Sequence, residues 1–277
     1  MKRQIYQGQC SICLAKNQDL TEDHVPPKGV YLRPTLKQTH RLKRFGSHDK
    51  KPGKRINGGL RFPTICRNCN NVLLGAKNDP ELIKFCKNIH THFFNSNGTG
   101  VLRIPFDGHK IARSVIGHIF AAHAINDESK ETIINTGEAD NLLRNYLLNE
   151  GIEFPSDWQL FCWPYYSKNN TQVILKSFTM ADLSNVTGGD SWYCHLLKFY
   201  PVGLFLTYKM PFRAKMNNDL IGLFEITPTS DSNGNAYFEF NRIPHDLFPE
   251  NPQGSLIILL YDKFTSSTSP QTPVTLK

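Results

Sequence analysis

The sequence has no run of 18 or more apolar residues, and this absence excludes a transmembrane helix. The first ten residues, Met1–Cys10, also lack the apolar stretch of a secretory signal peptide. We therefore expect a soluble protein in the cytoplasm. Wholesale disorder is excluded as well, because 39% of the 277 residues are hydrophobic and 11% are aromatic.

Acidic residues are scarce in the first part of the chain. Residues 1–80 hold sixteen Lys and Arg against five Asp and Glu, a net charge of +11, whereas residues 81–277 have a net charge of −3. Within residues 28–55, ten basic residues accompany a single acid, Asp49. Such a basic block is typical of contact with nucleic acid, although a solvated surface loop produces the same pattern.

The second part of the chain, residues 100–264, lacks the motifs that usually mark an active site. It contains no phosphate-binding loop, no nucleophile elbow and no cysteine cluster. It is mildly acidic and rich in aromatic residues, so we expect it to be a regulatory domain, or one that binds a protein partner or a signal ligand, rather than the main DNA surface.

Four of the seven cysteines form two C-x-x-C pairs, Cys10 with Cys13 and Cys66 with Cys69. In a reducing cytosol, two such pairs indicate a metal site before they indicate disulfides. Four thiolates make a closed tetrahedral zinc site, which is structural rather than catalytic. The long gap between the pairs implies an insertion. The other cysteines lie in apolar surroundings and are expected to be buried free thiols: Cys86, Cys162 and Cys194.

Apolar spacing and turn residues predict a mixed α+β fold whose strands pair in antiparallel fashion. Helices are expected to begin near residues 70–71 and to cover 80–93, 110–125 and 138–148. Strands are expected at 60–65, 158–166, 172–179, 192–209, 220–227, 236–240 and 255–261.

The stretch Asn95–Gly100, rich in Asn and Gly, predicts a linker between two domains. The first domain would comprise residues 1–95 with a basic, loop-like insertion at 28–57. The second would comprise residues 100–264. Residues 265–277 are rich in Ser, Thr and Pro, which predicts a disordered tail.

One arrangement of motifs points to a particular chemistry. Asp23-His24, followed by Pro26-Pro27, lies between the two cysteine pairs, and Asn70 directly follows the last cysteine. The order C-x-x-C, Asp-His-x-x-Pro, C-x-x-C-Asn resembles the HNH (ββα-metal) endonuclease superfamily. The likeness is closest to its four-cysteine zinc branch, of the phage endonuclease VII type, and covers residues 8–90.

This resemblance implies a treble-clef-like ββα-metal nuclease domain that acts on nucleic acid, with DNA as the expected substrate. Asp23 and Asn70 would hold a catalytic Mg²⁺ or Mn²⁺, and His24 would be the general base. Small domains of this type fused to other modules resemble effectors of bacterial restriction or antiphage defence. The structural zinc would be bound by the four paired cysteines: Cys10, Cys13, Cys66 and Cys69.

Other interpretations of these residues stay open. Asn70 could cap the following helix, and His24 could be an ordinary histidine. Glu22 could be the metal ligand in place of Asp23. In an ideal strand Asp23 and His24 point to opposite faces, so the strand must end or bulge near the two prolines for both to reach one phosphate.

The sequence departs from the family where Arg61 stands near the place of an expected Asn, so the base would need another orienting partner. We expect the basic residues to grip phosphates without reading bases. The main rival interpretation is a zinc-stabilised nucleic-acid-binding module without activity. Four histidines are expected to be structural: His90, His92, His118 and His123. The expected phosphate-binding residues are Lys28, Arg33, Arg41, Lys43, Arg44, Lys54, Arg55 and Arg61.

Overall fold

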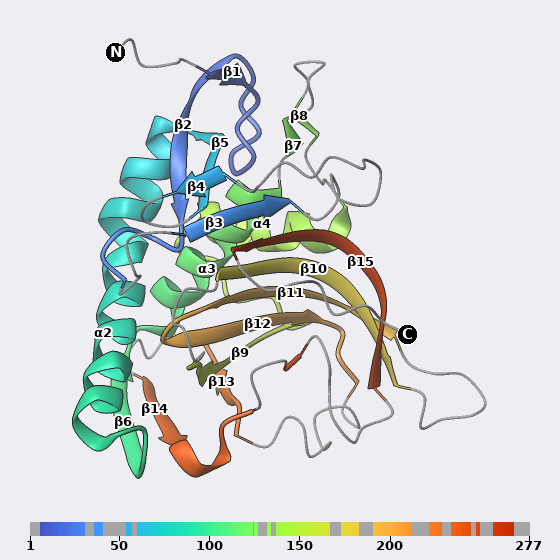
Figure 1. Cartoon of the computed structure of the whole chain (residues 1–277). Coiled ribbons are helices and arrows are strands. Elements are labelled where there is room, and N and C mark those ends of the chain that lie inside the picture. The colour runs from blue at the N-terminus through green and yellow to red at the C-terminus, as the bar shows by residue number, and fades with distance from the viewer. Residues whose placement is uncertain are drawn as a thin grey trace.

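The computed structural model has a mixed α+β fold with antiparallel sheets and a cysteine cluster near the N-terminus, as the sequence predicts (Figure 1). Only the backbone is described for residues 36–40, 54–56, 123, 125–126, 132–133, 181–182 and 257–268. The structure describes residues 6–30, 36–40, 54–56, 60–123, 125–126, 132–133, 137–166, 173–182, 191–211, 222–228, 234–244, 248–249 and 257–268.

The N-terminal part is a small sheet followed by a long helical segment. The sheet has the strand order β1-β2-β5 and is antiparallel throughout. The helical segment starts as a π-helix and becomes an α-helix at Asp79-Pro80, where the proline lacks the N–H that a helix interior would need. The bounds are β1 (Tyr6–Gly8), β2 (Gln18–Val25), β5 (Leu60–Cys66), η1 (Asn68–Asn78) and α2 (Asp79–Ser96).

The large sheet contains eight strands in the order β13-β9-β12-β11-β10-β15-β3-β4, and every neighbouring pair is antiparallel. In Figure 1 its strands β9, β10, β11 and β12 form a curved layer to the right of α2. Its strands are β3 (Leu36–His40), β4 (Lys54–Ile56), β9 (Trp158–Pro164), β10 (Val173–Asp182), β11 (Ser191–Phe199), β12 (Val202–Tyr208), β13 (Phe224–Ile226) and β15 (Ile257–Thr268).

Three features of this sheet differ from the predictions. The predicted strand 192–209 is two strands, because the chain turns at Tyr200-Pro201 between β11 and β12. Within the insertion predicted as loop, β3 and β4 form a ribbon that pairs with the end of β15. β15 itself continues to Thr268, so residues 265–268 belong to a strand and not to a disordered tail. For β3, β4 and β15, cross-strand hydrogen bonds decide the conformation, and local composition does not reveal them. For β11 and β12, Pro201 is a local signal that argues against one continuous strand.

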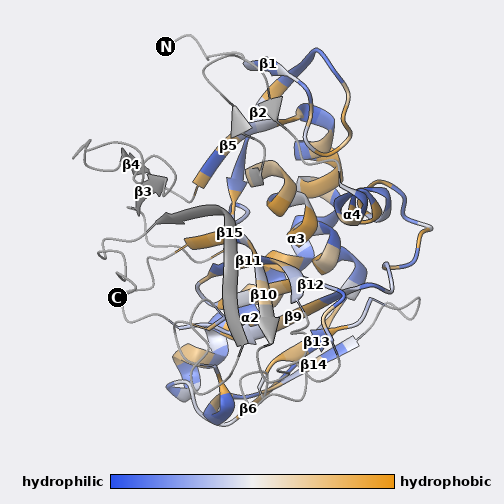
Figure 2. Ribbon diagram, turned by 90° about the vertical axis from the view of Figure 1, so that its right-hand side faces the viewer, coloured by the Kyte–Doolittle hydropathy of each residue, from blue (hydrophilic) through white to orange (hydrophobic). Residues whose placement is uncertain are grey.

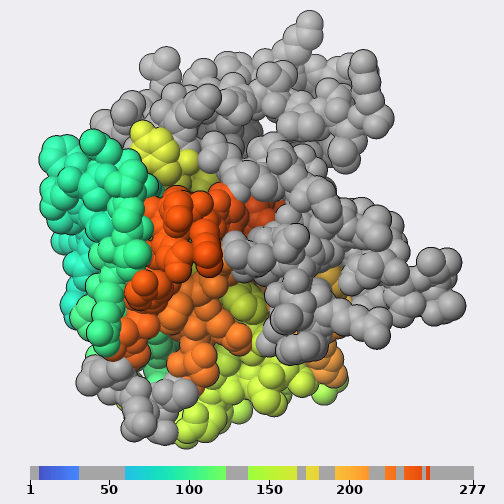
Figure 3. Space-filling model, turned by 90° about the horizontal axis from the view of Figure 1, so that it is seen from below, coloured from blue at the N-terminus to red at the C-terminus, as the bar shows by residue number. Residues whose placement is uncertain are grey.

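Two short pairings complete the fold. The strand β6 (Val101–Phe106) pairs with β14 (Gly234–Glu239), which leads into η3 (Phe240–Arg242). β7 (Ile125–Asn126) pairs with β8 (Thr132–Ile133). Seen from below, the β14–η3 segment in orange-red lies beside the teal and green α2–β6 segment, although more than a hundred residues separate them in the sequence (Figure 3).

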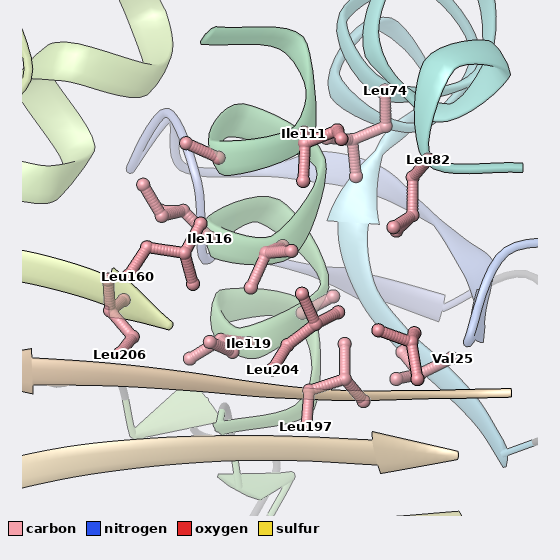
Figure 4. Close-up of a cluster of buried hydrophobic side chains, with 14 of the residues drawn as sticks. Val25, Leu74, Leu82, Ile111, Ile116, Ile119, Leu160, Leu197, Leu204 and Leu206 are labelled. Atoms are coloured by element: carbon pink, nitrogen blue, oxygen red, sulfur yellow. The ribbon is translucent and has the colours of Figure 1, made fainter. Parts of the chain in front are cut away.

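The helix α3 (Gly108–His123) is the centre of the molecule. It lies between the β2–β5 pair and the β11–β12 part of the large sheet (Figure 2). In the core, α3 is flanked by Leu74 of η1 and Leu82 of α2 and by Leu204 and Leu206 of β12 (Figure 4). The last helix, α4 (Glu138–Leu148), packs against α3 and has the predicted bounds.

The central strands of the large sheet are buried on both faces. On β12, Leu204 and Leu206 join the core around α3, whereas Phe205 joins a second apolar cluster with Phe161 and Phe178 on the opposite face. Burial on both sides explains why β12 has an almost continuous apolar sequence rather than a strict alternation.

One of the two hydrophobic clusters, the core around α3, contains residues from both parts of the chain. α2 ends at Ser96 and is followed by Asn97, whose positive φ of 53° terminates the helix inside the predicted linker. Beyond this turn, however, Ile111 packs in the same cluster as Val25 and Leu82. Covering β2 and β5 therefore depends on α3, which lies in the second predicted domain.

The predicted free thiols are confirmed: Cys86, Cys162 and Cys194 are all buried and unpaired. Among the described residues, no helix is both long and apolar enough to cross a membrane.

The close approach of α3 to η1 depends on Gly117. A Cβ atom at this position would lie 2.3 Å from Cδ2 of Leu74, a side chain that is fully buried. Gly117→Ala should lower the melting temperature, because overpacking costs about 1–3 kcal/mol and exceeds the roughly 1 kcal/mol that Ala gains in a helix. Leu74→Ala should then cost less in this variant than in the wild type. An unchanged melting temperature for Gly117→Ala would contradict the tight contact.

Candidate functional site

The four paired cysteines come together at one point, as predicted. Their sulfur atoms all lie within 4.8 Å of one another, and Sγ of Cys13 is 3.9 Å from Sγ of Cys66. Four thiolates around one zinc ion at about 2.3 Å are separated by about 3.8 Å, so the cluster is compatible with a structural zinc. All four cysteines are free thiols, and three of them are buried.

Local hydrogen bonds hold the first cysteine pair in place. The backbone N–H of Ser11 donates to the carbonyl of Thr64 in β5, at 3.0 Å. The carbonyl of Ser11 accepts from the guanidinium of Arg144 in α4 at 3.4 Å, and this guanidinium also lies over the ring of Phe120. The loop that carries Cys10 is thus anchored to β5 and to α4.

The thiols differ in acidity because of their contacts. A hydrogen bond from the Cys69 thiol lowers the pKa of Cys10 to about 5, although burial acts in the opposite direction. The same hydrogen bond raises the pKa of Cys69, and burial raises that of Cys13 to about 11. One thiolate is therefore favoured before any metal binds, which suits a site that binds a cation.

Purified protein should contain one zinc ion per chain by metal analysis. Cys69→Ser should lose this zinc and melt at a lower temperature, because the ion ties β5 and η1 to the Cys10 loop. Cys86→Ser is the matched control, since Cys86 is a buried thiol outside the cluster, and it should retain the zinc. Zinc retained by Cys69→Ser would contradict a four-cysteine site.

The Asp-His pair lies on β2 with its two side chains on opposite faces. Asp23 is 3% exposed and faces the core, whereas the neighbouring His24 is half-buried and Glu22 is exposed. A bulge at Asp23 or His24 would bring both side chains to one face, but the one bulge in this strand pair lies before them. Thr64 of β5 has no cross-strand partner there, because Thr21 pairs with Ile65 and Glu22 pairs with Pro63. From Glu22 to Val25 the pairing with β5 is regular.

Asn70 reaches β2 from the first turn of η1. Its side-chain nitrogen donates to Oγ1 of Thr21 at 2.9 Å and to the carbonyl of Glu22 at 3.2 Å. Its side-chain oxygen takes part in neither bond. No side-chain cap is found at the start of η1, so the helix-capping alternative for Asn70 is not what the structure shows.

His24 sits in a basic environment. It pairs directly across the sheet with Arg61, whose guanidinium is 3.4 Å from the Glu22 carboxylate. Burial lowers the pKa of His24 below its ordinary value, and the charges of Lys28 and Arg61 lower it further. The imidazole is therefore neutral at pH 7 and able to accept a proton. Among the described residues, we find no hydrogen bond to this imidazole.

The partner of Asp23 is a histidine of α3. His118 is fully buried, and its Nδ1 lies 2.8 Å from Oδ2 of Asp23. Its Nε2 lies 3.1 Å from Oδ1 of Asp79, which also accepts from Ser114 at 2.7 Å. Burial opposes charge on this imidazole, but Asp23 and Asp79 raise the pKa of His118 to about 10, so it is protonated at neutral pH. The sequence gives little indication of this role for His118, because a histidine on an apolar helix is its only visible signal.

A second buried imidazole, that of His195 in β11, has a similar setting. Its Nδ1 is 2.7 Å from Oγ of Ser177, and its Nε2 is 3.3 Å from Oδ1 of Asp140. The ring of Trp158 stacks on it at 5.6 Å. Serine, histidine and aspartate are all buried, so this group ties α4 to the large sheet and presents no nucleophile at the surface.

Two other histidines that were expected to have structural roles contact aromatic residues: Nδ1 of His90 lies 2.6 Å from the hydroxyl of Tyr200, and His92 packs on Phe240. These contacts agree with structural roles. The side chain of His123 lies outside the described residues. Among the predicted phosphate-binding residues, Lys28 and Arg61 are exposed. For Lys54 and Arg55 only the backbone of β4 is described. The remaining predicted phosphate ligands lie outside the described residues: Arg33, Arg41, Lys43 and Arg44.

Comparisons of the chain with protein families, with curated proteins and with solved structures found no match.

Proposed function

We propose that the chain is a metal-dependent endonuclease of the HNH type that hydrolyses DNA phosphodiester bonds. One observation carries this proposal. The antiparallel β2–β5 pair leads directly into the η1–α2 segment, and a cluster of four cysteines joins them. A neutral histidine faces outward from β2, and Asn70 of η1 binds the same strand at the carbonyl of Glu22.

In this proposal, His24 is the general base. A water molecule attacks the phosphorus while the imidazole takes its proton, and the bond from phosphorus to the leaving oxygen breaks. Lys28 and Arg61, both exposed near His24, attract the phosphate and keep the imidazole neutral. A positioned base of this kind contributes roughly 10²- to 10⁴-fold in rate.

Asn70 and a carboxylate of β2 are the residues that would hold a divalent cation. Mg²⁺ or Mn²⁺ prefers oxygen ligands and would stabilise charge at the leaving oxygen. The resemblance assigns the carboxylate to Asp23, but Asp23 faces the core and is bonded to His118. Glu22 shares the outer face with His24, and its own carbonyl accepts from Asn70. We therefore assign the carboxylate ligand to Glu22.

Plasmid DNA should be nicked by the purified protein with Mg²⁺, and His24→Ala should lose about 10²- to 10⁴-fold in rate while it still binds DNA. The rate should rise with pH through a midpoint below 6.5 and level off by about pH 7, because the base acts in its neutral form and its pKa is lowered. Duplex, branched and single-stranded DNA and RNA belong in the same assay. Full activity of His24→Ala would remove the assigned base.

The choice of carboxylate is tested by two amide variants. Glu22→Gln should raise the Mg²⁺ concentration needed for half-maximal rate, because it removes a ligand oxygen with negative charge. Asp23→Asn should lower stability, because it weakens the contact with His118, and should leave the Mg²⁺ requirement unchanged. The reverse result would assign the metal to Asp23.

The rival function is a zinc-stabilised nucleic-acid-binding module without activity. Two contacts favour this module. Asp23 is hydrogen-bonded to His118, and the Glu22 carboxylate lies 3.4 Å from the guanidinium of Arg61. Each carboxylate near His24 therefore already has a partner other than a metal ion. Binding that weakens steeply with salt, without cleavage of any substrate, would favour this module. In that case the second part of the chain would be the region that binds a protein partner or a signal ligand.

A further inference from the structure

A buried charged contact joins three elements directly behind the proposed site. The imidazole of His118 in α3 lies between Asp23 of β2 and Asp79, the first residue of α2. All three side chains are buried, and Ser114, one turn before His118, donates to Asp79 as well. Each ring nitrogen faces one carboxylate.

This contact acts on the same strand as Asn70. Asp23 lies between Glu22 and His24, and successive side chains of a strand point to opposite faces. A contact that holds Asp23 inward therefore holds Glu22 and His24 outward. Asn70 binds the same stretch from η1, through Thr21 and the carbonyl of Glu22. β2 is thus held by His118 of α3, which is buried, and by Asn70 of η1, which is half-buried.

We propose that His118 is a positioning residue for the site on β2, which it orients through Asp23. This inference rests on the proposed nuclease function for its kinetic consequence. His118 touches no reacting atom, and it is not a metal ligand in this arrangement, because its two nitrogens face carboxylates on opposite sides of the ring. Among the described residues, the four-cysteine cluster is the only group of three or more Cys, His, Asp or Glu side chains close enough to share one metal ion, and His118 is not part of it.

Two substitutions separate positioning from simple stability. The side-chain nitrogen of Asn can take the place of Nδ1, and that of Gln can take the place of Nε2. His118→Asn therefore keeps a donor toward Asp23, whereas His118→Gln keeps one toward Asp79 and loses the contact with β2. Both variants lose the charge and one hydrogen bond, so their stabilities should be similar.

His195→Gln is the matched control. His195 is also fully buried, also lies between two polar partners, Ser177 and Asp140, and is on β11, which does not pair with β2. All three variants are compared with the wild type at a temperature at which circular dichroism shows them folded. The measurements are kcat and KM for plasmid cleavage and amide hydrogen exchange at residues 22–25.

If the proposal holds, kcat of His118→Gln is on the order of tenfold or more below that of His118→Asn and of His195→Gln, with KM unchanged, because misplacement of a catalytic group affects the chemical step. Amides at 22–25 also exchange faster in His118→Gln alone. Equal kcat in the two His118 variants, with equal exchange, would overturn it. If the wild type cleaves nothing, the nuclease function fails, and exchange alone decides whether His118 holds β2.

Discussion

Burial of the His118 imidazolium is the constraint on which the arrangement of this protein depends. A charged side chain inside a core is tolerated only where opposite charges and hydrogen bonds surround it. Here Asp23 and Asp79 supply both, from β2 and from the start of α2. If β2, α2 and α3 moved apart, a buried charge would lose its partner. The contact therefore restricts their relative positions more than apolar packing alone would.

The cysteine cluster and the core around α3 support the same small sheet from two sides. The cluster ties the Cys10 loop to the end of β5, and Arg144 links that loop to α4. On the other side, α3 covers β2 and β5 with apolar side chains and approaches η1 closely at Gly117. The small sheet is thereby packed from two sides, which the proposed site would need in order to keep its side chains in place.

Much of the fold could be predicted from local pattern. The helical spacing of apolar residues gave the bounds of α4, and the two C-x-x-C pairs indicated the cluster that the structure contains. Predictions failed in two ways: long-range pairing decides the ribbon of β3 and β4 and the extension of β15 to Thr268, and a local turn divides β11 from β12. The pairing of β15 with β3 and β10 leaves no periodic trace in the sequence, because the partners lie far apart along the chain, whereas β11 and β12 are joined by a tight turn at Tyr200-Pro201.

The sequence by itself determined the chemistry available at the site: four thiols for a metal, a histidine beside two acids, and an Asn after the last cysteine. Tertiary structure alone decided which of these groups face solvent. The regular pairing from Glu22 to Val25 turns Asp23 inward, and a histidine 95 residues away supplies its partner. The reason is geometric, because a strand alternates its side chains between two faces and only the packing of α3 determines which face is buried.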